Sequence, residues 1–191
     1  KRERLDKILA NMGYGSRKDV KKLIKEGRVK VDNKLIKENN FKIDPYDTLI
    51  KVDGDEIIYR KYIYLMMNKP KDVVSSTEDP VSRTVLDLLD EEYLTFNPFP
   101  VGRLDKDTEG LLLLTNDGKL AHELLSPKKG VEKTYYLEVD GFIKESHIYE
   151  FKEGIILDDG YKTLPAKLEI IESNIFSKAK LTIKEGKFHQ V

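Results

Sequence analysis

Four consecutive leucines, Leu111–Leu114, stand between two glycine-bearing turns. A short apolar run bounded by turn-forming residues predicts a strand that is buried on both faces. Such a strand needs neighbouring strands and a covering layer on each side, so this part of the chain must belong to a folded domain. The polar loop before it, Gly102–Gly110, is therefore attached to rigid structure, where catalytic side chains are often carried.

Charged side chains crowd that loop, which presents Arg103, Asp105, Lys106, Asp107 and Glu109 in one short arc. Residue spacing alone does not say which carboxylate works. The simpler interpretation of such a segment is a solvated loop in which Asp and Thr residues stabilise turns. A pair of carboxylates such as Asp105 and Asp107 would also fit a glycosidase. The spacing marks a candidate active site and leaves its chemistry open.

The beginning of the chain predicts a small α+β domain over residues 1–59, joined to the rest by residues 60–62. Apolar residues recur at helical spacing in residues 4–12 and again after Ser16, a good N-cap with Asp19 placed for a capping box. Short strands are expected at residues 29–31, 35–36 and 49–52, with turn-forming pairs at 32–33, 44–45 and 53–54.

Residues 63–191 are expected to form a second, strand-rich domain. Strands are predicted at residues 62–67, 73–75, 111–115, 134–139, 166–171 and 179–183, and helices at 82–89, 119–125 and 145–153. Strands and helices do not alternate regularly, so a mixed or antiparallel sheet fits better than a doubly wound parallel sheet. The expected fold class is α+β in both domains.

Charge is unevenly distributed along a chain whose formal net charge is zero. Residues 1–60 carry 16 Lys or Arg against 11 Asp or Glu, whereas residues 61–191 carry 18 against 23. The excess is concentrated in residues 1–31, with 11 basic against 4 acidic residues. A solvated helix face is the ordinary explanation of a charge run, but a one-sided excess indicates that this part of the chain meets a polyanion.

The basic residues of the second predicted helix fall mainly three and four positions apart, on a face opposite Val20, Leu23 and Ile24. They are Arg17, Lys18, Lys21, Lys22, Lys25 and Arg28. A face of this kind binds phosphates with an affinity that falls steeply with salt, because each neutralised phosphate releases counterions.

The order of residues in RLDKILANMGYGSRKDVKKLIKEGRVKVDNKLIK closely resembles the small RNA-binding domain named after the fourth protein of the small ribosomal subunit. The resemblance implies two helices on a small sheet, with the RNA surface on the helix pair. It implies these RNA contacts: Arg4, Lys7, Ser16, Arg17, Lys18, Lys21, Lys22 and Arg28. Such a domain occurs in several unrelated proteins, so it implies RNA binding and no particular chemistry.

A second resemblance bears on the acidic loop. GRLDKDTEGLLLLTNDG resembles the signature loop of pseudouridine synthases, in the form found in the RsuA-like family that modifies ribosomal RNA. LMMNKPKDVVSSTEDPVSRTVLDLL, EKTYYLEV and EGKFHQV resemble further segments of that family, in the family's order. Together the two resemblances cover essentially the whole chain. They imply an enzyme that isomerises a uridine of ribosomal RNA, and they favour the small-subunit RNA.

The family's mechanism implies a role for each matching residue. Asp105 would be the essential carboxylate, acting either as nucleophile on the ribose or as base at the neighbouring sugar carbon. Arg103 would fill the space left by the flipped uridine, and Tyr135 would stack on the extruded base. Lys133 would lie beside Tyr135 at the bound base. The reaction is a redox-neutral isomerisation, so neither a metal nor an organic cofactor is expected.

The family's third motif continues beyond Val191 with a basic residue that pairs with the catalytic carboxylate. The catalytic domain is therefore expected to be incomplete at this end, and a protein that ends there is expected to be inactive. Arg103 and Lys133 are the nearby cations expected from the sequence, each with a role at the RNA.

The expected partner is ribosomal RNA or a ribosomal subunit assembly intermediate. No membrane association and no obligate protein partner are expected, and the protein is expected to be monomeric. The chain has no cysteine and no apolar run long enough for a membrane helix or a secretory signal, so a cytoplasmic location is expected. The alternative is a non-catalytic RNA-binding or ribosome-assembly factor built from the same two domains.

Overall fold

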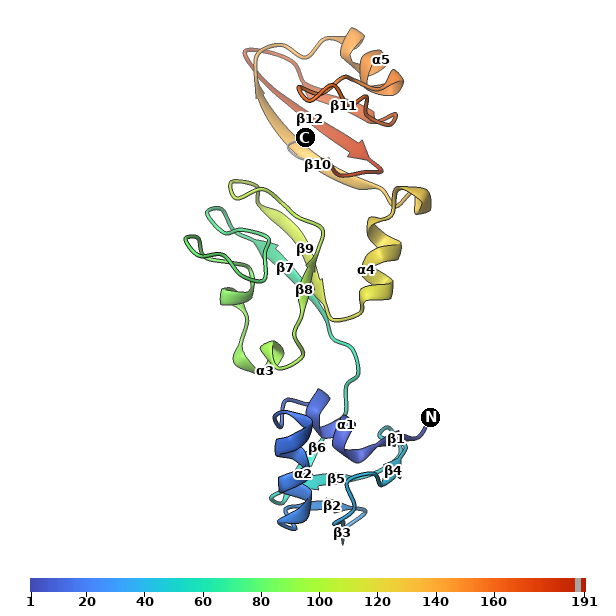
Figure 1. Cartoon of the computed structure of the whole chain (residues 1–191). Coiled ribbons are helices and arrows are strands. Elements are labelled where there is room, and N and C mark those ends of the chain that lie inside the picture. The colour runs from blue at the N-terminus through green and yellow to red at the C-terminus, as the bar shows by residue number, and fades with distance from the viewer. Residues whose placement is uncertain (188–189) are drawn as a thin grey trace. The chain divides into compact units, whose positions relative to one another are not determined.

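The computed structural model describes residues 1–187 and 190–191, and its contacts divide the chain into two units, Lys1–Asp117 and Gly118–Val191 (Figure 1). Both units combine short helices with antiparallel sheets, as the α+β prediction requires. Two residues of the predicted third motif, Phe188 and His189, lie outside the described residues. No helix in the described part of the chain is both long and apolar enough to cross a membrane.

The first unit begins with two helices, α1 (Leu5–Asn11) and α2 (Arg17–Lys25), that pack on small sheets. A four-stranded antiparallel sheet has the order β3-β2-β5-β6, and β1 pairs with β4. The strand bounds are Glu3–Arg4 for β1, Val29–Val31 for β2, Lys34–Leu35 for β3, Lys42–Ile43 for β4, Ile50–Val52 for β5 and Asp55–Ile57 for β6. Both predicted helices are confirmed, whereas β1, β4 and β6 were not predicted.

Two tight hairpins in this sheet follow directly from the sequence. Asp32 and Asn33 both have positive φ, 46° and 63°, and so do Asp53 and Gly54, at 53° and 97°. A two-residue hairpin turn with positive φ at both positions matches the right-handed twist of the strands, and Asn, Asp and Gly tolerate it best. These pairs join β2 to β3 and β5 to β6, so the turns predicted at both places are confirmed.

The rest of the first unit is built on the antiparallel sheet β7-β9-β8, with β7 at Tyr64–Lys69, β8 at Phe99–Val101 and β9 at Gly110–Thr115. In β9, Leu112 and Leu114 are buried, but Leu111 is 65% exposed. The prediction of a strand buried on both faces is therefore wrong within this unit. Side chains alternate across a strand, and only one face of β9 joins the core.

Residues 82–89 do not form the predicted helix. Within them, only Leu86–Leu88 makes a single 3-10 turn (η1). The reason is local. The Asp87 carboxylate accepts hydrogen bonds from the Thr84 N–H at 2.7 Å and from its hydroxyl at 3.1 Å. Such side-chain bonds offer the backbone an alternative to helical pairing. The strand predicted at 73–75 is reduced to one bridge, between Val74 and Thr84. A short helix, α3 (Glu91–Leu94), follows.

The second unit contains the antiparallel sheet β10-β12-β11 and the helix α5, which packs beside β11 (Figure 1). Its elements are α4 (Gly118–Leu125), the 3-10 turn η2 (Pro127–Lys129), β10 (Lys133–Asp140), α5 (Glu145–Glu153), β11 (Lys167–Glu172) and β12 (Phe176–Ile183). Its buried side chains come from β11, β12 and the loops beside them, and α4 adds Ala121. Every strand and helix predicted for this region is present.

Candidate active site and RNA-binding surface

The acidic loop is the connection between β8 and β9, which pair with Val101 opposite Leu113. Within it, the Thr108 N–H donates a hydrogen bond of 3.1 Å to the Asp105 carbonyl, closing a turn at the tip. The side chains of Arg103, Asp105 and Asp107 are all exposed. The loop therefore presents its carboxylates to solvent from the end of a rigid hairpin.

Hydrogen bonds from residues 72–75 fix the loop on either side of Asp105. The Ser75 hydroxyl donates to the Leu104 carbonyl at 2.8 Å and accepts from the Leu104 N–H at 3.0 Å. The Asp72 N–H donates to the Lys106 carbonyl at 2.8 Å. Since Leu104 and Lys106 are its chain neighbours, Asp105 stands on a backbone that is fastened both before and after it.

Beneath the loop lies a lysine whose role the sequence interpretation missed. Lys69, the last residue of β7, is fully buried. Its ammonium donates to the backbone carbonyls of Pro70 at 2.8 Å, Val73 at 2.7 Å and Lys106 at 3.3 Å. It thus ties the acidic loop to the segment that follows β7. The one signal in the sequence was a lysine between an apolar strand and a proline.

Electrostatics also link Lys69 to the loop. Burial lowers the pKa of Lys69, because a charged ammonium loses hydration inside the protein. The carboxylates of Asp107 and Asp105 oppose this effect most strongly, followed by those of Asp72 and Glu109. Arg103 and Lys133 were the cations expected near the catalytic carboxylate, and the structure adds Lys69 as a buried cation in the field of Asp105.

Tyr135 and Lys133 belong to the second unit, where both lie on β10. They are two residues apart, so they share one face of the strand. Tyr135 is partly buried and packs against the core of its sheet. Lys133 is partly buried too, which lowers its pKa, and its ammonium donates to the Val131 carbonyl at 3.0 Å. Their placement at the base beside Asp105 stays a prediction.

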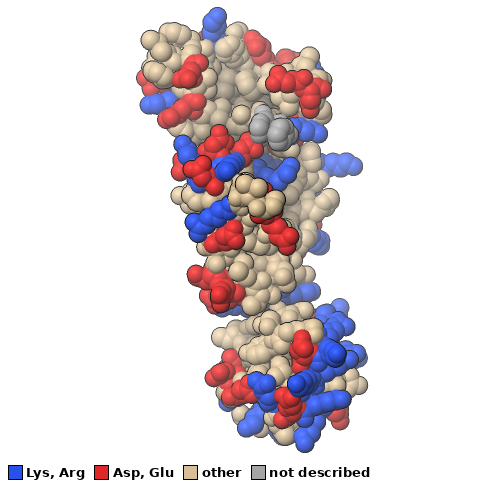
Figure 2. Space-filling view, turned by 60° about the vertical axis from the view of Figure 1, so that its left-hand side comes forward, with Lys and Arg blue, Asp and Glu red and all other residues tan. Residues whose placement is uncertain are grey.

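The basic face predicted on α2 is confirmed. The capping box at its start is present, with the Ser16 N–H bonded to the Asp19 carboxylate at 2.9 Å and the Asp19 N–H to the Ser16 hydroxyl at 3.3 Å. Val20 and Ile24 are buried in the domain core. The exposed basic residues of this helix are Arg17, Lys18, Lys21, Lys22 and Lys25. Figure 2 shows Lys and Arg side chains gathered on one side of this domain, at the bottom of the view.

Three other predicted RNA contacts are engaged within the protein. Arg28 makes a two-pronged ion pair with Asp53, at 2.8 and 2.5 Å, and this pairing lowers the pKa of the Asp53 carboxyl. Arg4 pairs likewise with Asp6, at 3.0 and 2.7 Å. Burial raises the pKa of Asp6, but the bonds from Arg4 outweigh it and the net shift is downward.

Lys7 pairs with Glu3 at 2.8 Å. It is the third of the predicted RNA contacts that hold an intramolecular carboxylate. The cations of α2 are held less tightly than these three. The ion pair between Lys22 and Glu26 has a long distance of 3.9 Å. A basic helix face that suits phosphates and a fastened loop that presents carboxylates fit the class of enzymes that act on a nucleic acid.

Comparison with known proteins narrows this class. Residues 63–191 match the family of RNA pseudouridylate synthases, and residues 3–49 match the S4 domain. The chain therefore belongs to the RNA pseudouridylate synthase family and is an isomerase, which confirms the resemblance noted from its sequence.

Relatives and a solved structure agree with this assignment. The chain is 53% identical to an uncharacterised RNA pseudouridine synthase of Bacillus subtilis, over 98% of this chain and 79% of the relative. It is 38% identical to the ribosomal large subunit pseudouridine synthase B of Bacillus subtilis, over 99% and 78% of the two chains. It is 41% identical to the ribosomal small subunit pseudouridine synthase A of Vibrio cholerae, over 98% and 80%. A crystal structure of a pseudouridylate synthase matches with a TM-score of 0.61 and 34% identity, over 98% of this chain and 79% of that one.

Proposed function

We propose that this protein converts a specific uridine of ribosomal RNA to pseudouridine, with Asp105 as the catalytic carboxylate. In this reaction the bond from N1 of uracil to the anomeric carbon breaks and a bond from C5 to that carbon forms, while C5 loses a proton and N1 gains one. The observation that carries the proposal is the position of Asp105. Its side chain is exposed at the tip of a hairpin loop, and hydrogen bonds hold the backbone of that loop at Leu104 and Lys106. A reacting carboxylate needs such a fixed support, since small misplacements are costly in rate.

The remaining roles follow the same proposal. Arg103 occupies the space left when the target uridine flips out of its helix, and Tyr135 stacks on the extruded base. Lys133 lies beside Tyr135 on β10 and contacts the bound nucleotide. Asp105 acts either on the ribose as nucleophile or on the neighbouring sugar carbon as base.

The amino-terminal domain, residues 1–59, supplies affinity through phosphate contacts. Its contacts are those inferred from the sequence, Arg4, Lys7, Ser16, Arg17, Lys18, Lys21, Lys22 and Arg28. Residues 60–62 join it to a catalytic domain at 63–191. Ribosomal RNA or an assembly intermediate is the proposed substrate, because relatives of similar identity are named for the large and the small ribosomal subunit. We further propose that the enzyme acts in the cytoplasm as a monomer.

Tritium release tests this function. RNA of the small and the large ribosomal subunit, each labelled at C5 of uracil, is incubated with the protein both as free RNA and as immature particles. Release of tritium to water from one of these RNAs supports the proposal, and we expect it from the small-subunit RNA. Tight RNA binding with no release from any of them would instead favour a non-catalytic assembly factor.

A further inference from the structure

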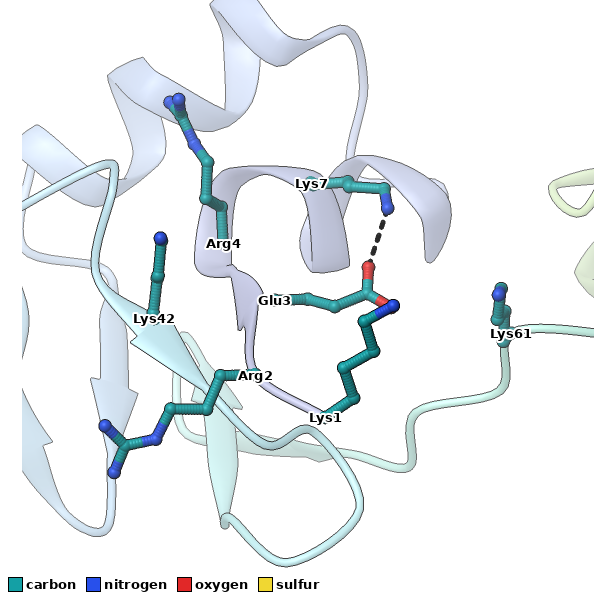
Figure 3. A pocket seen from close by; sticks show the side chains of 7 residues that line it. All are labelled: Lys1, Arg2, Glu3, Arg4, Lys7, Lys42 and Lys61. Atoms are coloured by element: carbon teal, nitrogen blue, oxygen red, sulfur yellow. Dashed lines mark hydrogen bonds and ion pairs between the residues drawn. The ribbon is translucent and has the colours of Figure 1, made fainter.

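A basic hollow of ≈ 350 Å³ lies at the beginning of the first unit (Figure 3). Six cationic residues and one carboxylate line it: Lys1, Arg2, Arg4, Lys7, Lys42 and Lys61 around Glu3. Only Arg4 and Lys7 were assigned to RNA from the sequence. The other four are cations that neither the helix pair nor the acidic loop accounts for.

Strand pairing forces two of these charges together. In the pairing of β1 with β4, Arg4 lies directly opposite Lys42. Residues paired in this way point to the same face, about 4.5–5.5 Å apart at Cβ, and like charges at such positions destabilise the sheet. Arg4 is compensated by Asp6, at 2.7 Å. For Lys42, no carboxylate among residues 1–187 and 190–191 lies within ion-pair distance.

Glu3 is the one carboxylate of the lining, and it is already held by Lys7 at 2.8 Å, the dashed line in Figure 3. Lys61 enters from the segment after β6, with its ammonium 4.9 Å from the centre of the Tyr62 ring. Contact with Tyr62 and, less strongly, the charge of Glu3 raise the pKa of Lys61, so its ammonium is charged at neutral pH. Glu3, Asp6 and Asp44 pair with Lys7, Arg4 and the amino group of Lys1. Lys42 and Lys61 form no ion pair with a carboxylate of the described residues, so the hollow keeps an excess of positive charge.

We propose that this hollow binds a phosphodiester group of the RNA backbone, and that Lys42 and Lys61 are its uncompensated phosphate contacts. The inference rests on the proposed RNA-binding function and extends its surface from the helix pair onto β4 and the segment after β6. Two features support RNA. Arg4 and Lys7 belong both to the hollow and to the inferred RNA surface, so the two are continuous. Exposed lysines also suit phosphate as point charges.

The test compares two double variants that remove the same charge from the same domain. Lys42→Gln with Lys61→Gln alters the hollow. Lys30→Gln with Lys34→Gln is the matched control, since both lysines are exposed on the separate sheet β3-β2-β5-β6. Affinity for a small-subunit ribosomal RNA transcript is measured by filter binding at several salt concentrations, after thermal melting has shown that both variants fold.

We expect the hollow variant to bind about fivefold more weakly near physiological salt. Its slope of log affinity against log salt should be smaller by roughly 0.7–0.9 for each phosphate that the variant no longer neutralises. The control should stay within about twofold of the unaltered protein at every salt concentration, as expected for charges outside the RNA path.

An unchanged salt slope in the hollow variant would overturn the inference. Equally weakened RNA binding in the control would overturn it too, because the loss of affinity would then follow from net charge alone. Loss of binding to phosphatidylglycerol vesicles with RNA binding intact would assign the hollow to lipid and overturn it as well. The assay needs no turnover. A hollow-dependent slope in a protein that releases no tritium would refute the proposed activity and leave this inference standing.

Discussion

The basic face of α2 and the acidic loop before β9 are both exposed and charged, but the protein holds them differently. The cations of α2 stand on long side chains above a helix that is fixed by its cap and by buried Val20 and Ile24. The loop's backbone is fastened by hydrogen bonds from Ser75, Asp72 and Lys69. The helix therefore places a set of positive charges on one face, without fixing each ammonium. The loop instead holds the backbone of Asp105 in one position.

This difference suits binding at the helix and catalysis at the loop. Phosphate contacts of the kind proposed for α2 add up with little regard to the position of each ammonium, so each would contribute a share of the affinity. A reacting carboxylate has no substitute, and a displacement of about 1 Å can cost about 10²-fold in rate. We therefore expect changes on the helix to be graded, and changes at the loop to be severe and to depend on position.

The largest effect should come from Asp105→Asn. An amide keeps the shape of the side chain but can neither attack the ribose nor abstract a proton. Turnover should fall by at least about 10²–10⁴-fold, the range for removing a group that moves a proton, with RNA affinity within a few-fold of the original. A parallel fall in affinity would show that binding and chemistry are not separable at this residue.

Lys69→Met should come next. It removes the ammonium that three backbone carbonyls share. The Lys106 carbonyl keeps the Asp72 N–H as a donor, but the Val73 carbonyl, in the one of the three bonds that is buried, loses the ammonium at a cost of about 1–3 kcal/mol. Thermal or denaturant unfolding should show the destabilisation, and turnover should fall with it. Lys71→Met is the matched control, because Lys71 is exposed and its nearest carboxylate, Glu109, is 4.0 Å away. Equal stability of the two variants would contradict the role given to Lys69.

On the helix, Lys18→Gln with Lys21→Gln should weaken RNA binding by about tenfold and flatten its salt dependence by roughly 0.7–0.9 per phosphate contact. Turnover at saturating RNA should be unaffected, because neither lysine touches the loop. Binding isotherms over a range of salt, together with initial rates, separate the two effects. A lowered rate at saturating RNA would show that α2 takes part in the chemical step as well as in binding.

A smaller effect is expected from Ser75→Ala, which removes both hydrogen bonds to Leu104. Each is worth about 0.5–1.5 kcal/mol, so turnover should fall by roughly five- to tenfold while RNA affinity is kept. Ser76→Ala is the control, since Ser76 makes the same two kinds of bond, but to the backbone of Glu78 outside the loop. If both variants behaved alike, the fastening of Leu104 would not matter to the chemistry.

The smallest effect concerns acid. The hydrogen bond from the Ser16 hydroxyl lowers the pKa of Asp19 below its ordinary value. Between the lowered pKa and the ordinary pKa, the folded state binds fewer protons than the unfolded chain. The stabilisation is therefore present above the ordinary pKa and is lost as pH falls through the lowered pKa. Amide exchange of α2 should quicken as pH drops through this interval, relative to other helices. Asp19→Asn should abolish that response, and Asp47→Asn, at an exposed site in the same domain, should keep it.

The two regions also differ in how far the sequence predicts them. The amphipathic spacing of α2, its capping box and the paired turn residues at 32–33 and 53–54 act between neighbours in the chain, so reading the sequence found them. The loop was found as a charged segment, and Asp105 was assigned by resemblance alone. The hydrogen bonds from Ser75 and Lys69 to the loop join residues 29 and 37 positions apart, and no local pattern predicts such bonds.

The wrong predictions have equally physical causes. Helical spacing favoured a helix at 82–89, but the carboxylates of Asp79 and Asp87 accept hydrogen bonds from nearby backbone N–H groups and hold this segment in turns. The leucine run predicted burial on both faces, yet Leu111 faces out of its sheet. Ion pairs such as Arg28 with Asp53 were also beyond prediction, because they form between side chains that only the fold brings together.

The most direct test of Asp105 as the catalytic carboxylate is the single-turnover rate of pseudouridine formation. Enzyme is in excess over RNA, so that differences in affinity do not affect the rate. Asp105→Asn and Asp107→Asn are compared, since each replaces an exposed carboxylate of the same loop with an amide. If Asp105 is the catalytic carboxylate, Asp105→Asn gives no product above background and Asp107→Asn gives a measurable rate. The reverse order, or a rate for Asp105→Asn within about tenfold of the unaltered enzyme, well short of the 10²–10⁴-fold loss expected, would contradict it.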